Sequence, residues 1–120
     1  MTNLDAVTRW IGNYQAAWAS NDPDQIGDLF TGDAAYYPEP FAKPWRGREQ
    51  IVAQWLARKD DPGSWTFEWH PLIVTEDLAV LEGETVYPTT RYSNLWVLRL
   101  DQSGQARQFT EWWMDQSKPS

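Results

Sequence analysis

One carboxyl group stands among aromatic residues on a predicted strand near the C-terminus. Residues 106–115 are predicted to form this strand, and Glu111 shares one of its faces with Phe109 and Trp113, because side chains two apart point the same way. A buried carboxyl flanked by rings has a raised pKa unless a donor or a cation pairs with it. Glu111 is therefore a candidate general acid or base, or a ligand anchor. The alternative is a structural acid held by a donor such as Arg91 or a tryptophan N–H.

The single histidine, His70, is a second candidate for proton transfer, since an unperturbed imidazole titrates near neutrality. It shares one face of a predicted strand with Glu68, whereas the opposite face carries Trp65, Phe67 and Trp69. The aromatic face is the better candidate for burial, which would leave His70 exposed or at a subunit interface. If the faces are reversed, His70 enters the interior as a proton shuttle.

The composition excludes several classes of chemistry and of partner. With no cysteine and one histidine, no cluster with zinc-ligand spacing can form, and we expect neither a metal nor a cofactor. The seven glycines are scattered, so there is no glycine-rich phosphate loop, and no nucleophile elbow surrounds a serine. A net charge of −7 argues against binding nucleic acids or anionic membranes, both of which attract basic surfaces.

Aromatic residues make up 15% of the 120 residues, and nine of them are tryptophan. Such rings either fill a small core or line a cavity, since ligand pockets are mostly apolar with a few placed polar groups. The longest unbroken apolar run is four residues, far short of a membrane span of about 20. The N-terminus lacks the basic start and the apolar stretch of a signal peptide, so we expect a cytoplasmic protein.

Hydrophobic periodicity predicts helices in the first half of the chain and strands in the second. Val7, Ile11, Tyr14 and Trp18 recur at helical spacing, which gives the first helix one apolar face. Helices followed by clustered strands predict an α+β fold with an antiparallel sheet that can curl around the helices. The expected elements are helices at 3–20, from Pro23 and from Gly47, and strands at 34–37, 65–75, 78–87, 91–100 and 106–115.

We expect one domain over residues 1–116, followed by a frayed tail at 117–120. Within the strand at 78–87, Glu82 and Glu84 share one face. They raise the same question as His70 on the strand before it, namely whether that face points inward or outward. The pattern alone leaves open which face of these two strands points inward.

Five stretches of sequence, spread from the first helix to the last strand, carry a family resemblance. They are WASNDPD at 18–24, LFTGDA at 29–34, PWRGREQI at 44–51, YSNLWVLRLD at 92–101 and EWW at 111–113. Together they resemble the nuclear-transport-factor-2-like superfamily and, within it, the SnoaL-like proteins. The resemblance implies a cone-like curved antiparallel sheet wrapped around three N-terminal helices. The superfamily holds isomerases, cyclases, dehydratases, epoxide hydrolases and binding domains, so the fold does not decide the function.

The resemblance also implies roles for three residues. Tyr14 is similar to the oxyanion-hole tyrosine of the ketosteroid isomerases, which share this superfamily; the alternative is a core tyrosine. Glu39, followed by Pro40, lies where an Asp-Pro supplies the general base in those enzymes; the alternative is a solvated loop acid. Trp96 stands where the isomerases place a protonated aspartate. Its indole N–H is a donor that cannot ionise, or its ring simply fills the cavity.

These residues together define an expected site. The resemblance turns the face of Glu111 into the cone, where Tyr14 and Trp96 would donate to a developing oxyanion and Glu39 or Glu111 would act as the base. The expected ligand is small and apolar or aromatic. Its expected contacts are Trp18, Trp55, Phe109, Trp113, Asn94 and His70.

Two classes of function fit this expectation. The first is a cofactor-independent isomerase, cyclase or dehydratase that acts on a ketone-bearing substrate. The second is a non-catalytic binding module, or a structural dimer with a filled cavity. In either case the resemblance implies a homodimer that pairs the outer faces of two sheets, with Trp112 or Trp69 in the interface.

Overall fold

The structure of the chain is a computed structural model that describes residues 3–61 and 63–118. The predicted tail at 117–120 is therefore described only as far as Lys118, and Pro119 and Ser120 lie outside the described residues. The helices lie in the first half and four long strands in the second, as expected. In chain order the elements are α1 (Leu4–Ser20), α2 (Pro23–Asp28), β1 (Phe30–Tyr37), β2 (Trp45–Arg46), α3 (Arg48–Ala57), β3 (Thr66–Val74), β4 (Ala79–Val86), β5 (Arg91–Leu100) and β6 (Ala106–Asp115).

Capping residues set the ends of the first two helices. Asn3 caps α1, because its side-chain oxygen accepts a hydrogen bond of 2.9 Å from the backbone N–H of Ala6. The helix stops at Asn21, which adopts a left-handed φ of 53°. Asp22 then caps α2, and Pro23 fills its first position, where a missing N–H costs nothing. Between its caps, α1 buries Val7, Trp10, Ile11, Tyr14 and Ala17 on one side.

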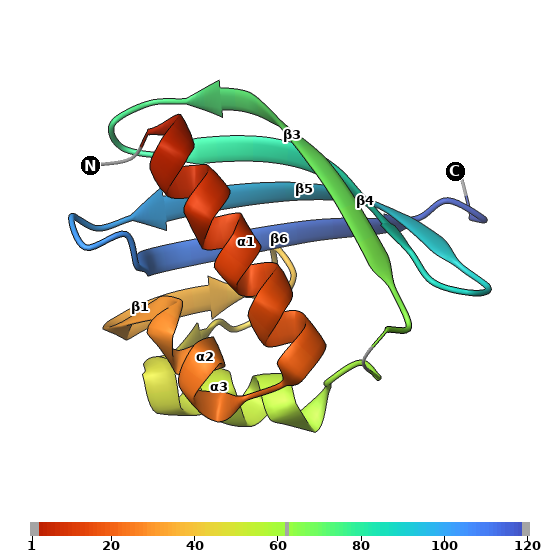
Figure 1. Ribbon diagram of the computed structural model, residues 1–120, viewed down its shortest axis with the longest axis horizontal. Helices are drawn as coiled ribbons and strands as arrows, with labels where there is room; N and C mark the ends of the chain where they lie inside the picture. Colours follow the sequence, from red (N-terminus) through yellow and green to blue (C-terminus); the bar gives the residue numbers. More distant parts are fainter. Residues whose placement is uncertain (1–2, 62, 119–120) are drawn as a thin grey trace.

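The six strands form one curved, unclosed sheet in the order β2-β1-β6-β5-β4-β3 (Figure 1). Strands β3 to β6 pair antiparallel through hairpins, as predicted. The sheet is not antiparallel throughout, because β1 runs parallel to β6. Strand β1 also begins at Phe30 rather than at the predicted position 34, and the two-residue β2 was not predicted. No hairpin links β1 to β6, so nothing local fixes their relative direction.

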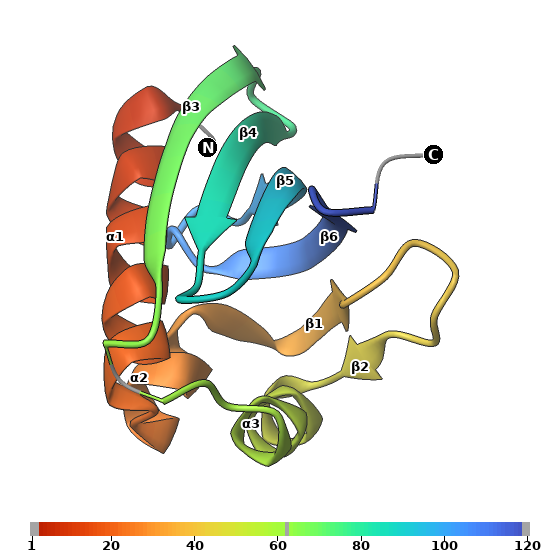
Figure 2. The ribbon, with the colours of Figure 1, turned by 90° about the vertical axis from the view of Figure 1, so that its right-hand side faces the viewer.

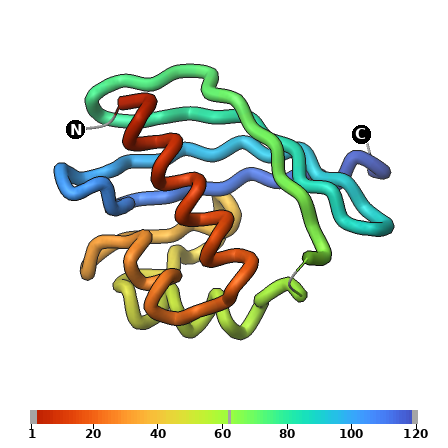
Figure 3. The backbone as a smooth tube through the Cα atoms, viewed as in Figure 1, coloured from red at the N-terminus to blue at the C-terminus, as the bar shows by residue number. Residues whose placement is uncertain are grey.

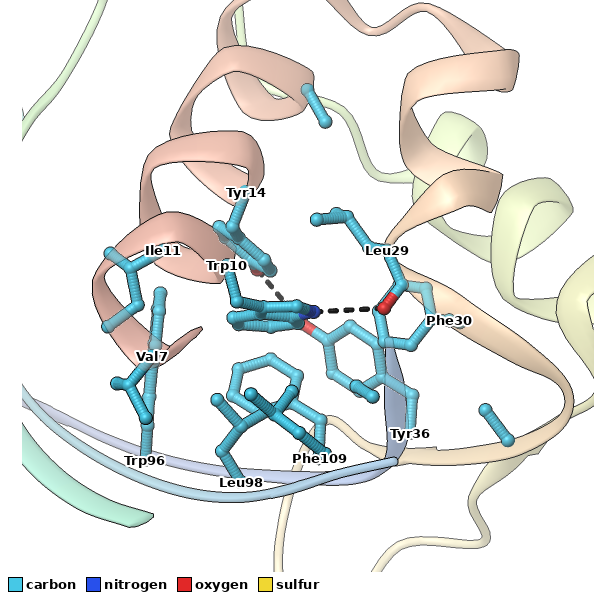
Figure 4. Close-up of a cluster of buried hydrophobic side chains, with 14 of the residues drawn as sticks. Val7, Trp10, Ile11, Tyr14, Leu29, Phe30, Tyr36, Trp96, Leu98 and Phe109 are labelled. Carbon is cyan, nitrogen blue, oxygen red and sulfur yellow. Dashed lines mark hydrogen bonds between the residues drawn. The ribbon is translucent and has the colours of Figure 1, made fainter. Parts of the chain in front are cut away.

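The sheet curls so that α1 crosses its concave face, while α3 lies beside β1 and β2 (Figure 2). At one end this interior is filled by side chains, which we call the closed end. Trp10 lies at its centre, 2% exposed, with T-shaped contacts to Phe30, Trp96 and Phe109. The indole N–H of Trp10 donates to the carbonyl oxygen of Leu29 at 2.9 Å (Figure 4). The α+β, cone-like fold expected from the sequence is confirmed.

Glycine at position 83 allows one aromatic ring to reach the concave face. A Cβ on Gly83 would lie 2.7 Å from the ring of Phe67, too close for any real contact. With that space free, Phe67 is 8% exposed and stacks on Trp96, with ring centroids 4.7 Å apart. Its strand partner Thr85 is 3% exposed on the same face. The inward faces of β3 and β4 are therefore the ones that carry Phe67 and Thr85.

The other end of the interior is framed by loops, and we call it the open end. The turn between β4 and β5 reaches the same side of the molecule as the end of β6 (Figure 3), where Gln116 N donates to Arg91 O at 3.0 Å. The loop between β1 and β2 projects outward from these two strands (Figure 2), and Pro38, Glu39, Ala42 and Lys43 of this loop line the same opening. Among the described residues, no helix is long and apolar enough to cross a membrane.

Candidate active site

The open end holds a cavity of about 970 Å³, a size suited to a small molecule. Strands β1, β2, β4, β5 and β6, helices α1 and α3, and the loops at the open end all contribute to its lining. Three of the polar side chains on its wall lie close together: Tyr14 from α1, Tyr36 from β1 and Glu111 from β6. Its aromatic lining also includes Trp18, Trp45, Trp55, Tyr87, Tyr92 and Trp113.

A chain of hydrogen bonds links those three polar side chains. The hydroxyl of Tyr36 donates to Glu111 Oε1 at 2.8 Å, and the hydroxyls of Tyr14 and Tyr36 lie 3.2 Å apart. Figure 4 shows the two tyrosines pointing toward each other from α1 and β1. Because Tyr36 has one proton and gives it to the carboxylate, its oxygen accepts the proton of Tyr14. When Glu111 is protonated, each bond can reverse, and the Tyr14 proton is then free to point into the cavity.

Burial dominates the electrostatics of Glu111. The pKa of its carboxyl is raised from 4.5 to about 7, mainly because burial removes water from the charged form, and the negative charge of Asp60 contributes to the rise. The hydrogen bond from Tyr36 and the nearby N–H of Trp96 act in the opposite direction and lower it. Near neutral pH this carboxyl is therefore close to half protonated, which suits both the donation and the acceptance of a proton.

Burial also raises the pKa of both tyrosines well above 10, and the charge of Glu111 adds to that effect. Both hydroxyls thus stay protonated at neutral pH. Tyr14 is 6% exposed and lies on the cavity wall, so it can act as a hydrogen-bond donor to a ligand but not as a base.

Trp96 pairs directly with Glu111 across β5 and β6, so the two side chains share one face of the sheet. Its indole nitrogen is buried and forms no hydrogen bond of ordinary geometry within the described residues. The N–H is nevertheless close enough to the carboxyl of Glu111 to lower its pKa. Trp96 is not part of the cavity lining. Its donor therefore faces the carboxyl group and not the space where a ligand would lie.

A second carboxylate, Asp60, lies on the opposite part of the lining, in the segment after α3. Its Oδ2 accepts from the indole N–H of Trp18 at 2.8 Å and from the hydroxyl of Tyr87 at 2.7 Å. The backbone oxygen of Asp60 accepts from Asn21 Nδ2 at 3.1 Å. These bonds tie the end of α1 to the end of β4 and hold one side of the opening in shape.

Four of the six expected ligand contacts lie in the cavity lining: Trp18, Trp55, Asn94 and Trp113. Asn94 Oδ1 accepts from the hydroxyl of Thr85 at 2.7 Å, which leaves its amide N–H groups for other partners. Phe109 is fully buried and packs against Tyr14 and Tyr36, outside the lining. It belongs to the closed end because the intervening tyrosine rings cover it.

His70 is not in the cavity, in contrast to the ligand contact expected of it. Its Nε2 lies 3.1 Å from Glu82 Oε1 on the convex face, with about 63% of the side chain exposed. The inward turn of Phe67 places every second residue of β3, His70 among them, on the outside. Glu39 lines the mouth of the cavity on the loop after β1, where it is exposed. Arg91, the suggested partner of Glu111, instead lies 3.8 Å from Glu84.

The sequence analysis did not single out Tyr36 or Asp60. The signal for Tyr36 was present, because two-residue alternation puts it on the same face as Ala34, which is buried. Asp60 gave no such signal, since its partners Trp18 and Tyr87 are distant in sequence and its own segment looks like a turn. Within residues 3–61 and 63–118, no group of three acidic, histidine or cysteine side chains is arranged to hold a metal ion.

Comparison with solved structures gives the same fold at low sequence identity. An NTF-2 like protein of unknown function from Burkholderia xenovorans matches with a TM-score of 0.75 and 15% identity, over 97% of this chain and 88% of that one. A ketosteroid isomerase-like protein from Erwinia carotovora matches at 0.68 and 16%, over 97% of both chains. A steroid delta-isomerase from Pseudomonas aeruginosa matches at 0.65 and 17%, over 96% and 83%.

A search among curated proteins found no match. The family model of the SnoaL-like domain, by contrast, matches residues 11–114. This span runs from the middle of α1 to the end of β6. This span includes Tyr14, Tyr36, Asp60 and Glu111. The chain therefore belongs to the SnoaL-like domain family.

Proposed function

We propose that this protein is an enzyme that moves a proton within a small carbonyl compound without a cofactor, as an isomerase or a lyase. The observation that carries the proposal is the carboxyl of Glu111. It stands on the wall of an aromatic cavity, bonded to Tyr36 at 2.8 Å, with burial raising its pKa to about 7. A carboxyl poised near the working pH is an effective proton carrier.

In this proposal Glu111 takes the proton from the carbon next to the carbonyl group of the substrate. The C–H bond breaks, an O–H bond forms on Glu111, and negative charge moves to the carbonyl oxygen. Protonation of Glu111 reverses the hydrogen bonds of Tyr36 and Tyr14, so that Tyr14 donates toward that oxygen as the charge develops. Return of the proton to another carbon completes an isomerisation. In a dehydration, the C–O bond of a β-hydroxyl group breaks, Glu111 gives its proton to the leaving oxygen, and water is released.

Trp96 and Glu39 take different parts from those first expected. The N–H of Trp96 faces Glu111, so Trp96 is a positioning residue that favours the ionised carboxyl. Glu39 is exposed at the mouth, where water solvates its charge, and the proposal does not use it as the base.

The test is the exchange of the α-protons of 2-tetralone in D2O, followed by NMR. We expect exchange above the buffer rate with the unaltered protein and a loss of about 100-fold or more in Glu111→Gln, which keeps the shape and removes the base. Glu82→Gln is the matched control, because Glu82 lies on the convex face beside His70. Equal rates in the two variants, or no exchange above buffer with the unaltered protein, would contradict the proposal.

A second candidate is a non-catalytic module that binds a small molecule. One observation favours it: the hydroxyls of Tyr14 and Tyr36 and the carboxylate of Glu111 already satisfy one another without any ligand. Such a closed network can serve purely as a polar anchor. Binding of 2-tetralone, seen by calorimetry, with no α-proton exchange would favour this module over the enzyme.

We also propose that the protein is a homodimer formed through the convex face of the sheet. Large apolar side chains remain exposed there, with Ile73 at 53%, Trp112 at 37% and Met114 at 69%. Leu95 and Val97 of β5 lie in the same cross-strand rows of the sheet as these side chains, so the apolar surface runs across neighbouring strands. Sedimentation equilibrium at micromolar concentration should give twice 14.0 kDa, and a monomer would contradict the proposal.

A further inference from the structure

Three cationic side chains stand around the mouth of the cavity: Lys43, Arg58 and Lys59. The chain has 17 acidic residues against 10 basic ones, so cations gathered at one opening stand out from the rest of the charge distribution. Within the part of the chain that the structure describes, neither of the ion pairs involves them, since these pairs join His70 to Glu82 and Arg91 to Glu84.

Arg58 is held in place at this opening. Its guanidinium carbon lies 5.4 Å from the centre of the Trp45 ring, and Nη1 donates to Gln54 Oε1. Trp45 in turn packs on Tyr36, with ring centroids 4.7 Å apart, and Tyr36 donates to Glu111. A continuous surface of side chains therefore leads from a fixed guanidinium at the mouth to the carboxyl on the cavity wall.

Among the described residues, the carboxylates of the lining form no ion pairs with these cations. Asp60 is already bonded to Trp18 and Tyr87, and Glu111 is bonded to Tyr36. At the mouth itself Glu39 is one exposed carboxylate against three cations. The remaining N–H groups of Arg58 and the ammonium groups of the two lysines are thus available to an anion.

We propose that the ligand of this cavity is an organic acid, whose anionic group binds Arg58 with help from Lys43 and Lys59. A guanidinium presents parallel N–H groups that match the two oxygens of a carboxylate, and a phosphate offers similar oxygens. The ring or apolar body of the ligand lies against the aromatic lining and reaches toward Tyr14 and Glu111. This inference rests on the proposed function only in that the cavity takes a small molecule, and it adds the charge of that molecule.

The first test compares probes that share a ring system and differ in charge. Isothermal titration calorimetry with 1-naphthylacetate and with 1-naphthylacetamide should show the acid binding about tenfold more tightly. This is the gain in affinity expected from one partly exposed pair of charge-assisted hydrogen bonds. Equal affinities, or no binding of the acid, would overturn the proposal. Titration with 1-naphthyl phosphate separates the two sources of the anion, because tighter binding than the acetate indicates a phosphate ester and weaker binding indicates a carboxylic acid.

The second test uses two variants that remove the same charge from different places. Arg58→Gln should weaken 1-naphthylacetate about tenfold and leave the amide unchanged. Arg107→Gln is the matched control, because Arg107 is exposed on β6 and is not part of the cavity lining. An equal loss in both variants would assign the effect to the net charge of the protein and overturn the proposal. Should Arg58→Gln fail to fold by circular dichroism, Lys59→Gln carries the same comparison.

Glu111→Gln separates this proposal from the proposed function. The preference for acid over amide should survive in Glu111→Gln, while the exchange of 2-tetralone protons is lost. An acid preference without any proton exchange in the unaltered protein would leave the organic-acid site standing and reject the enzyme. Proton exchange without an acid preference would support the enzyme and reject the organic-acid site.

Discussion

The two ends of the interior are built in different ways. At the closed end, Trp10 and Phe109 come from the middle of regular elements and are almost fully buried. At the open end, Lys43 and Lys59 come from loops, and Arg58 from the residue that follows α3. Tyr14, on α1 just beyond Trp10, stands between the two regions.

We expect this difference to separate the residues that determine stability from those that determine recognition. A ring packed on every side adds to the free energy of folding, whereas an exposed cation on a loop adds little. Glu111 belongs to both groups, because it lies on a regular strand, β6, and has a pKa that burial raises to about 7. We therefore expect substitutions at the two ends to separate into losses of stability and losses of binding, with Glu111 affecting both.

The largest expected effect is the removal of a ring from the closed end. Trp10→Ala should destabilise the protein by about 3–5 kcal/mol, because it leaves a cavity and strips the Leu29 carbonyl of one donor. Trp45→Ala is the matched change at the open end, where the ring is only partly buried, and should cost about 1 kcal/mol. Urea unfolding measures both. Equal losses would show that the open end is as tightly packed as the closed end.

Much of this closed end was accessible from the sequence. The stripe of Val7, Ile11 and Tyr14 predicted which side of α1 is buried. Two-residue alternation favoured the aromatic face of β3 for burial but left its direction open, and the structure turns Phe67 inward. The parallel pairing of β1 with β6 was not predicted. These strands are separated by most of the chain, and no turn chemistry or local periodicity links them.

The site was only partly predictable for a similar reason. Glu111 and Tyr14 stood out by their places on amphipathic elements, and they lie on the cavity wall. Their connection through Tyr36 depends on two hydrogen bonds between residues 22 and 75 positions apart, which no local pattern encodes. His70 could be a ligand contact only if the faces of its strand were reversed, and because Phe67 takes the inner face of β3, His70 lies on the convex face.

Glu111→Gln should produce the next largest effect, on the dependence of stability on pH. Glutamate has a pKa of 4.5 when unperturbed and about 7 in the fold, so between these values the folded protein holds a proton that the unfolded chain has lost. The unaltered protein should therefore lose stability as the pH rises through this window, by about 2 kcal/mol after allowance for partial exposure to the cavity.

Glutamine does not titrate, so this slope should be absent from Glu111→Gln and present in Glu82→Gln. Urea unfolding at pH 4 and pH 8 measures it. The variant should be the more stable protein relative to the unaltered chain at pH 8 and not at pH 4. Parallel pH profiles for Glu111→Gln and the unaltered protein would mean that the carboxyl is well solvated.

Tyr36→Phe should give a smaller change, confined to the carboxyl. Removing the hydroxyl deletes the bond that stabilises ionised Glu111, so the pKa of that carboxyl should rise by about one unit. Tyr37→Phe is the matched control, since Tyr37 is the next residue and points to the other face of β1. An NMR titration of the Glu111 side-chain carboxyl carbon follows the change. An equal pKa in both variants would remove Tyr36 from the network.

The smallest expected effect on stability belongs to Arg58→Gln, and it sharpens the contrast between the two ends most directly. The guanidinium is exposed and makes one cation–π contact and one hydrogen bond, so its loss should cost less than about 1 kcal/mol. Arg107→Gln should cost no more, and thermal melting monitored by circular dichroism compares the two. A melting temperature close to that of the unaltered protein, together with weakened binding of 1-naphthylacetate, would assign Arg58 to recognition alone. A large drop in the melting temperature would instead make Arg58 a structural clamp on α3 and Trp45, and the open end would then no longer differ in kind from the closed end.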